Sequence, residues 1–529
     1  MILPFFFFLI MLYSCTKDYF NFEKLSKKIE TDHTFALPII HSKLIFRDII
    51  RDYNYEHLFE EDETNLLYLI YSDIKQTDNA ENIIFIPDQT LNIEYSSNEF
   101  ITSGFPIISP ITISKDLSYV FTFQEPGDKI DTIVIKNALF KLEINSSFNC
   151  PGFIKFIFND IVKNGNPYIK EIAIGQDGNY NTTYEYTDLD GYKIILDDNH
   201  LNYKVEYTLY SDNCSLPNNV QTTITINFLN LSYKIIWGKI AEREIFIKDT
   251  VEIEFFKNAE AGNVYFVDPK LFFTIGNSYG NPFELSFLEF KTYSTIYQDL
   301  ITRQLPPEYQ TVFVNYPFLP IEYAKTNIIL DTLSYPEIRD VIYHNPKKIF
   351  FNLKARLLTS NKSFILDTSR IIVNSGLRFS LIGKTNPWIL KDTLNFDFSK
   401  ILTEASDNNI QDTNFEYLKF NIIAINKSPT EVKLQVYFTD SLYNIIDSLF
   451  NDSYILKSGV TDENGKVIES FTKKTQTTFT QNRIKNLKDT KKAIIKVLIV
   501  TTNNGNKIVR IYSTDYVELK VSLMFNVKN

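Results

Sequence analysis

The sequence predicts an all-β protein built from tandem antiparallel β-sandwich domains of the Ig-like or Greek-key type. Apolar and polar residues alternate over 138–145 and 220–228, the period of a strand with one face in a core and one in water. Turn dipeptides of the tight-hairpin type separate such runs: Asn164-Gly165, Asp177-Gly178, Asp190-Gly191, Asn464-Gly465 and Asn504-Gly505. Because a long helical period is almost absent, sandwiches are favoured over a parallel α/β sheet.

The length of 529 residues suggests two to four domains. We expect a first β-sandwich domain over 33–240, a second β-rich domain over 241–344 and a C-terminal β-sandwich domain over 345–529. A proline-rich stretch over 305–320 and a short helix over 335–344 precede the second boundary. Clean alternation over 517–527 predicts a last strand that ties down the C-terminus.

The N-terminus begins with an unbroken apolar run from Met1 to Tyr13. A membrane-spanning helix needs about 20 apolar residues, so this run is too short to span a bilayer. It has the length of a signal-peptide core. The competing interpretation is a buried N-terminal strand.

Leu12-Tyr13-Ser14-Cys15 resembles the processing box of bacterial lipoproteins. The resemblance implies that residues 1–14 are a removed signal peptide, that Cys15 carries palmitate-type acyl chains, and that 15–32 form a lipid anchor and tether. Lys17-Asp18 is similar to a short form of the surface-export signal of Bacteroidota lipoproteins. The expected location is the outer membrane, on its periplasmic or cell-surface face, with the surface favoured.

The composition limits the classes of ligand. The formal net charge is −10 with acids and bases interspersed, which argues against a nucleic-acid partner because a phosphate backbone needs a basic surface. There are 44 Phe and 32 Tyr but 2 Trp, so few indole rings could stack on a glycan. The 16 Gly make backbone cradles for phosphates improbable.

Two cysteines remain if Cys15 is lipidated, namely Cys150 and Cys214. Both lie in loop-like sequence, and an even pair in an oxidising compartment can form a disulfide. Such a bridge would stabilise the chain by roughly 4 kcal/mol in the chain-entropy model. Two unpaired buried thiols are the alternative.

The sequence predicts no catalytic residues, no metal site and no cofactor. None of the five histidines has metal-ligand spacing, and there is no nucleophile elbow, phosphate loop or dinucleotide fingerprint. The segment 188–191 (Asp-Leu-Asp-Gly) could be a calcium loop, but it lacks the later ligands, so a hairpin turn is favoured. Paired carboxylates for glycoside hydrolysis cannot be identified among 64 acidic residues.

A short motif, Asp followed by Ser or Thr and an aliphatic residue, occurs six times. It resembles the O-glycosylation acceptor of Bacteroidota envelope proteins. The acceptors would be Thr132, Thr250, Thr332, Thr393, Ser441 and Ser448. The structural alternative is an Asp that closes a turn through side-chain hydrogen bonds before a strand.

Several segments together resemble uncharacterised multi-domain β-rich lipoproteins of Bacteroidota. They are the processing box, the entry segment 35–40, the pattern over 268–282 and the ending Tyr-Val-Glu-Leu-Lys-Val at 516–521. The similarity covers most of the chain and implies a location and an architecture but no activity.

The leading functional hypothesis is a non-catalytic envelope lipoprotein, an accessory or binding subunit of an outer-membrane protein assembly. Its partners would be the membrane, through the lipid, and an outer-membrane protein or a polysaccharide. A pilin-like fimbrial subunit, cleaved after Arg47 or Arg51 and donating its C-terminal strand, and a surface glycan-binding lipoprotein are alternatives. A hydrolase on a β scaffold is a further one.

Overall fold

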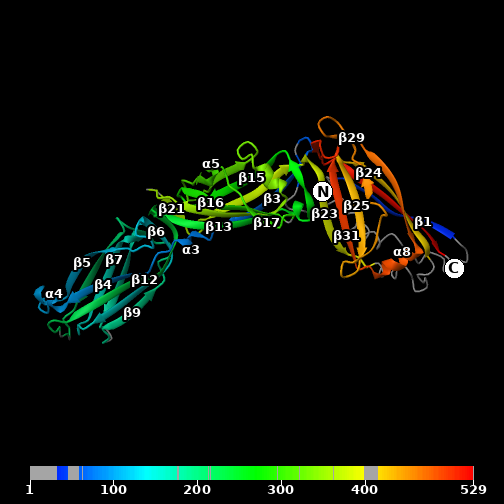
Figure 1. Ribbon diagram of the computed structural model, residues 1–529. Helices are drawn as coiled ribbons and strands as arrows, with labels where there is room; N and C mark the ends of the chain where they lie inside the picture. The colour runs from blue at the N-terminus through cyan, green and yellow to red at the C-terminus, as the bar shows by residue number, and fades with distance from the viewer. Residues whose placement is uncertain are drawn as a thin grey trace.

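The computed structural model describes residues 33–45, 59–61, 63–175, 178–212, 214, 216–294, 296–320, 322–360, 363–397 and 415–527. The predicted signal peptide 1–14, Cys15 and the tether lie outside these residues. Within them the chain is nearly all β, and every named strand pairing is antiparallel, which confirms the predicted fold class. Figure 1 shows three sandwiches that follow one another along a bent rod.

The first sandwich occupies one end of the rod. Its strands are β4 (Gln89–Ser96), β5 (Ile111–Val120), β6 (Lys129–Ser146), β7 (Gly152–Lys163), β8 (Asn166–Ile174), β9 (Asn181–Tyr186), β10 (Lys193–Ile195), β11 (His200–Leu209) and β12 (Gln221–Lys239). One layer has the order β8-β7-β11-β5 and the other β9-β6-β12-β4, with β10 paired to both β6 and β7. The helix α4 (Ser97–Thr102) lies at its outer end.

The predicted alternation produces the core of this sandwich. Phe140 of β6 is fully buried, and its ring centroid lies 5.6 Å from that of Phe158 on β7 and 5.1 Å from that of Phe228 on β12. The β7–β8 hairpin turns at Asn164 and Gly165, with φ of 53° and 82°. These are the positive angles for which Asn-Gly is selected in two-residue hairpins.

The second sandwich forms the middle of the rod. Its strands are β2 (Phe59–Glu61), β3 (Leu67–Gln76), β13 (Arg243–Glu252), β15 (Pro269–Asn277), β16 (Phe283–Ser294), β17 (Asp299–Thr302), β18 (Thr311–Val314), β19 (Ala324–Leu330), β20 (Pro346–Leu357) and β22 (Ile371–Ser380). One sheet has the order β19-β15-β22-β3-β2 and the other β13-β20-β16-β17, with β18 also on β16. Short helices lie in its connections: α3 (Ala80–Ile83), η2 (Glu254–Phe256), α5 (Pro307–Gln310) and α6 (Ile338–Tyr343).

The third sandwich forms the other end. Its strands are β1 (His33–Ile45), β14 (Ala259–Phe266), β23 (Ile382–Asn395), β24 (Phe415–Lys427), β25 (Thr430–Thr439), β26 (Ile445–Ser448), β27 (Tyr454–Leu456), β30 (Phe471–Thr480), β31 (Lys492–Thr501), β32 (Val509–Arg510) and β33 (Tyr516–Val527). One sheet has the order β1-β33-β24-β30 and the other β14-β23-β31-β25-β26. The hairpin β28 (Val460–Thr461) and β29 (Val467–Glu469), the helix α8 (Gln481–Asn486) and η4 (Leu487–Asp489) complete it.

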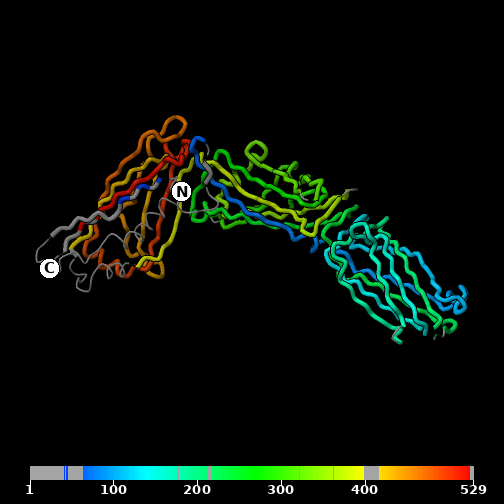
Figure 2. The backbone as a smooth tube through the Cα atoms, turned by 180° about the vertical axis from the view of Figure 1, so that it is seen from behind, coloured from blue at the N-terminus to red at the C-terminus, as the bar shows by residue number. Residues whose placement is uncertain are grey.

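The predicted domains 33–240, 241–344 and 345–529 do not coincide with the three sandwiches, although the boundary at 240 falls just after β12. The N-terminal β1 pairs with the C-terminal β33 along its whole length, so residues of the predicted first domain complete the third sandwich. Likewise β3 pairs with β22 across both predicted boundaries, and β20 pairs with β13 across the second one. Figure 2, seen from behind, shows the blue β3 among the green strands of the second sandwich. Strand partners are chosen by long-range packing, which local periodicity does not report.

The junction between the first and second sandwiches contains a strand pairing and a buried ion pair. The short strand β21 (Ser363–Leu366) leaves the second sandwich and pairs with β12 of the first. Next to it, Arg243 donates to both carboxylate oxygens of Asp128, at 3.1 and 2.6 Å, with side chains 7 % and 3 % exposed. Paired strands and a two-point ion pair restrict bending at this junction.

The junction between the second and third sandwiches is filled by a cluster of aromatic side chains. The ring of Trp388 on β23 is fully buried and stacks on Phe255, with centroids 4.9 Å apart. Phe266 and Phe379 lie 4.3 Å apart in the same cluster. Backbone hydrogen bonds join Leu67, Leu381 and Ile511 beside these rings. This junction is therefore packed as a core and not as a flexible linker.

Asp515 is a buried carboxyl group just before β33, and it makes the stability of the third sandwich depend on pH. It is 3 % exposed and accepts a hydrogen bond from the Tyr512 N–H at 2.9 Å. Burial raises its pKa to about 6, against the smaller lowering effects of that N–H and of two lysines. Because the folded pKa exceeds the unfolded one, the stabilisation is complete below about pH 4 and is lost as the pH rises through 6.

We therefore expect Asp515→Asn to be more stable than the wild type at pH 7.5, by up to about 3 kcal/mol, and to lose the advantage near pH 4. The Asn side chain still offers an oxygen to the Tyr512 N–H. Urea unfolding of both proteins across this pH range measures the difference. Parallel pH profiles for the two proteins would contradict the assignment.

Candidate functional site

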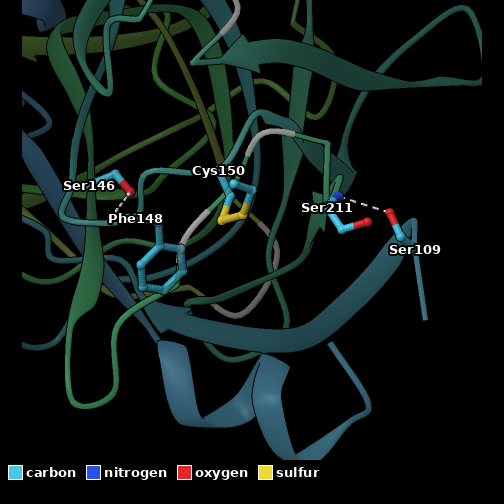
Figure 3. The surroundings of a disulfide bond; sticks show 6 residues. Ser109, Ser146, Phe148, Cys150 and Ser211 are labelled. Carbon is cyan, nitrogen blue, oxygen red and sulfur yellow. Dashed lines mark hydrogen bonds between the residues drawn. A yellow bond between two sulfur atoms is a disulfide. The ribbon is translucent and has the colours of Figure 1, made fainter. Parts of the chain in front are cut away.

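The two remaining cysteines are bonded to each other at the outer end of the first sandwich. Cys150, fully buried just before β7, forms a disulfide with Cys214 in the connection between β11 and β12, with Cα atoms 4.6 Å apart. Figure 3 shows that the loop before β5 lies close by, where Ser211 donates its N–H to the Ser109 hydroxyl at 2.9 Å. The bridge and this bond hold the loops at the end of the rod together.

The loop over 103–110 presents two apolar side chains at this end. Ile107 is 95 % and Ile108 55 % exposed, whereas Phe105 is buried and anchors the loop in the core. Backbone bonds from Phe105 to Phe100 and from Ile108 to Gly104 fix its path. An ordered loop that exposes isoleucine is a candidate contact surface, because apolar residues fixed on a rigid loop can fill a pocket of a partner.

A pair of carboxyl groups lies where β3 and β13 approach each other in the second sandwich. Burial raises the pKa of Asp249, whose side chain accepts a hydrogen bond from the buried Ser375 hydroxyl. Burial acts to raise the pKa of Asp73 too, but hydrogen bonds from Lys75, 2.9 Å away, and from the Ile74 N–H outweigh it and lower that pKa. The two carboxyl groups thus differ in proton affinity.

Two carboxyl groups of different pKa are what a hydrolase needs, but here a substrate could not reach them. The Asp249 side chain is 1 % exposed and Ser375 is fully buried, so no substrate can reach between them. Glycosidases separate their carboxylates by about 5–9 Å around an open sugar site. We therefore interpret the Asp73–Asp249 pair as structural: it lies where β3 of one sheet approaches β13 of the other.

An open hollow of about 360 Å³ lies elsewhere, at the junction of the first and second sandwiches. It is lined by Ile83, Gln124, Glu125, Glu242, Arg243, Glu244 and Arg356. Its guanidinium groups are engaged, Arg243 with Asp128 and Arg356 with Glu242 and Glu284. The carboxyl pair described above does not line it, so the two features do not combine into one site.

In the calcium candidate over 188–191, both carboxylates bind other side chains of the protein. Asp188 accepts hydrogen bonds from the Tyr168 hydroxyl at 2.8 Å and from Lys170 at 2.7 Å, and Asp190 pairs with Lys234 at 2.9 Å. Across the described ranges, no three His, Cys, Asp or Glu side chains gather as a metal site would require.

The six predicted glycosylation acceptors all lie within the described residues. Their Asp neighbours mostly play the structural role: the carboxylates preceding Thr250, Thr393 and Ser448 accept the N–H of that residue, at 2.6–2.8 Å. Asp331 and Asp440, before Thr332 and Ser441, accept N–H groups further along their turns.

The six predicted acceptors differ in how exposed their side chains are. Thr393 and Ser441 are exposed, while the other four are half-buried, and Thr132 lies between two paired strands. Glycosylation stays a prediction, and it is sterically simplest at the two exposed residues.

The aromatic and membrane features complete the survey. Trp388 is fully buried and offers no indole face to a ligand, and Trp237 in β12 is half-buried. In the part of the chain that the structure describes, no helix has the length and apolar character needed to cross a bilayer.

Comparison with known proteins adds little. No family model matches the sequence, and no curated protein matches it. A crystal structure of a candidate secreted protein from Parabacteroides distasonis shares 9 % identity and a TM-score of 0.26, covering 55 % of this chain and 88 % of that one. A triple jelly-roll protein of an archaeal virus shares 8 % identity and a TM-score of 0.10, covering 82 % and 94 %. Likeness at this level carries no argument about function.

Proposed function

We propose that this chain is a non-catalytic lipoprotein of the bacterial envelope that holds its first sandwich away from the membrane and presents it to a protein of an outer-membrane assembly. The observation that carries the proposal is the placement of the chain ends. β1, which follows the proposed anchor, and β33 both belong to the third sandwich, and the first sandwich lies at the opposite end of the rod (Figure 1).

Three further features support the proposal. The box at residues 12–15 and the segments that resemble Bacteroidota lipoproteins suggest an envelope location. The Cys150–Cys214 disulfide suits an oxidising compartment. The ordered Ile107–Ile108 loop at the far end offers an apolar contact of the kind that protein interfaces use.

The alternatives are less well supported. A fimbrial role would require β33 to leave its sheet, although it is paired with β1 on one side and β24 on the other. Arg47 and Arg51 lie outside the described residues. A glycan-binding role gains nothing from the buried Trp388. A hydrolase would need access to its carboxyl pair, which Asp249 lacks.

Anchoring is tested with Cys15→Ala. We expect the wild type to fractionate with outer membranes and the variant to be soluble, because several acyl chains, each CH₂ contributing about 0.8 kcal/mol, hold the protein almost irreversibly. Metabolic labelling with an acyl precursor should mark the wild type alone. Equal membrane retention of both proteins would reject the lipoprotein assignment.

Partner binding is tested by pull-down of the tagged protein from mild-detergent extracts of envelopes. A stoichiometric outer-membrane protein should copurify with the wild type and be lost with Ile107→Ser/Ile108→Ser. Leu333→Ser is the matched control, since Leu333 is 90 % exposed on the second sandwich. Equal loss with the control, or no partner at all, would count against presentation by the first sandwich.

A further inference from the structure

The base of the rod is the end of the third sandwich where several strands start or stop together. The register of one sheet places His33, Phe415 and Val527 side by side there. In the other sheet, Thr439 at the end of β25 lies opposite Lys492 at the start of β31. The turn 440–444 and the helix α8, which follows Thr480 opposite Tyr417, therefore belong to the same base.

The turn 440–444 and the first residue of β26 expose three large side chains at the base. Leu442 is 78 %, Tyr443 51 % and Ile445 63 % exposed. The turn is ordered, because Asp440 accepts the N–H groups of Leu442 at 2.8 Å and Asn444 at 2.9 Å. An exposed apolar group fixed in this way is not a frayed loop end.

The chemistry around these side chains is that of a membrane interface. The Lys492 ammonium lies 3.7 Å from the centroid of the Tyr443 ring. The adjoining segment 481–492 carries Arg483, Lys485, Lys488, Lys491 and Lys492 against Asp489. Two nearby carboxylates are neutralised, Asp447 by Arg483 and Asp397 by Lys491. Apolar residues beside tyrosine and lysine are typical of segments that lie at the headgroup boundary.

The proposed anchor brings a bilayer to this base. Residues 16–32 connect Cys15 to His33, and a chain of this length reaches at most about 60 Å. A tether of this length keeps the base at a high effective concentration near the lipid. Apolar contacts between the base and the lipid can then form, although they are too weak to keep an unanchored protein on the membrane.

We propose that the base docks on the lipid bilayer, with Leu442, Tyr443 and Ile445 inserted at the boundary between headgroups and acyl chains, which requires the neighbouring Ser441 to carry no glycan. This inference rests on the proposed lipidation of Cys15. Docking adds a second contact to the lipid anchor and sets the direction in which the rod leaves the membrane. The first sandwich is then held out from the surface and does not swing freely on the tether.

The test uses the full-length lipidated protein in vesicles of phosphatidylethanolamine and phosphatidylglycerol. An environment-sensitive fluorophore is attached to Leu442→Cys at the base or, as the matched control, to Ile107→Cys at the opposite end. We expect the label at 442 to shift to the blue and to be quenched by bromine in the acyl chains. The label at 107 should behave as in water.

A second measurement uses the unlipidated Cys15→Ala protein, in which only the base can bind lipid. Leu442→Ser/Ile445→Ser should weaken its partition into the same vesicles at least about tenfold, the value of burying one such side chain. Ile107→Ser/Ile108→Ser should not change it.

The outcomes separate this inference from the proposed function. If the lipidated protein is anchored but the label at 442 stays in water, docking is wrong and the lipoprotein assignment stands. If both labels enter lipid, the rod lies flat and the inference is overturned. If the wild type is not acylated, the proposed function itself fails, and vesicle binding by the Cys15→Ala protein would still support the base as a lipid-contacting surface.

Discussion

Arg243→Ala should lower the free energy of unfolding by about 3–5 kcal/mol, because it leaves the Asp128 carboxylate buried without its partner. Asp128 then keeps the Ala241 N–H, at 2.8 Å, as a hydrogen-bond donor. The loss should be largest at the junction of the first and second sandwiches. Urea unfolding followed through Trp237, which lies on β12 beside β21, reports on this region.

Two comparisons isolate the cause. Arg356→Ala removes a second arginine of the same junction, but that side chain is 36 % exposed, so we expect a much smaller loss than for Arg243→Ala. Asp128→Asn in the Arg243→Ala background removes the unpaired charge and should recover part of the stability. Equal losses for the two arginines, or no recovery, would show that the buried pair is not what stabilises the junction.

Cys150→Ala/Cys214→Ala should destabilise the first sandwich by about 4 kcal/mol, since the bridge closes a loop across a sequence separation of 64 residues. For a unit of this size the melting transition should fall by roughly 10 °C. Scanning calorimetry should show the shift in one transition, with the transition of the third sandwich unchanged.

The wild type in reducing buffer should reproduce the shift without any change of side-chain volume. Protease digestion should also cut the loop over 103–110 faster, since the neighbouring Ser211–Ser109 bond would be less constrained. A melting profile that does not respond to reductant would mean that the disulfide adds no stability.

The sequence predicts the strands well because a strand that is buried on one face alternates apolar and polar residues. Residues 138–144 and 222–228 alternate in sequence, and their apolar members are buried in the structure. The helix expected over 335–344 is found as α6 (Ile338–Tyr343). The Asn164-Gly165 hairpin follows from the φ angles that those residues favour.

The domain boundaries and the carboxyl pair could not be predicted, because both depend on which strands meet. Nothing local in β1 indicates that its partner is β33, or that β3 pairs with β22. Asp73 and Asp249 are two of 64 acidic residues, and they meet because the edges of two sheets approach each other. The burial of Trp388 likewise depends on Phe255 and Phe256 of η2, which lie far from it in the sequence.

The pairing of β1 with β33 has a consequence for biogenesis. As the chain is synthesised from its N-terminus, β1 appears early, but its partner is made about 490 residues later. The sheet that contains β1 cannot close until synthesis is nearly finished, and unpaired strand edges are prone to aggregate in the meantime. Chains that terminate early would therefore keep an open strand edge that proteases monitoring incomplete chains could recognise.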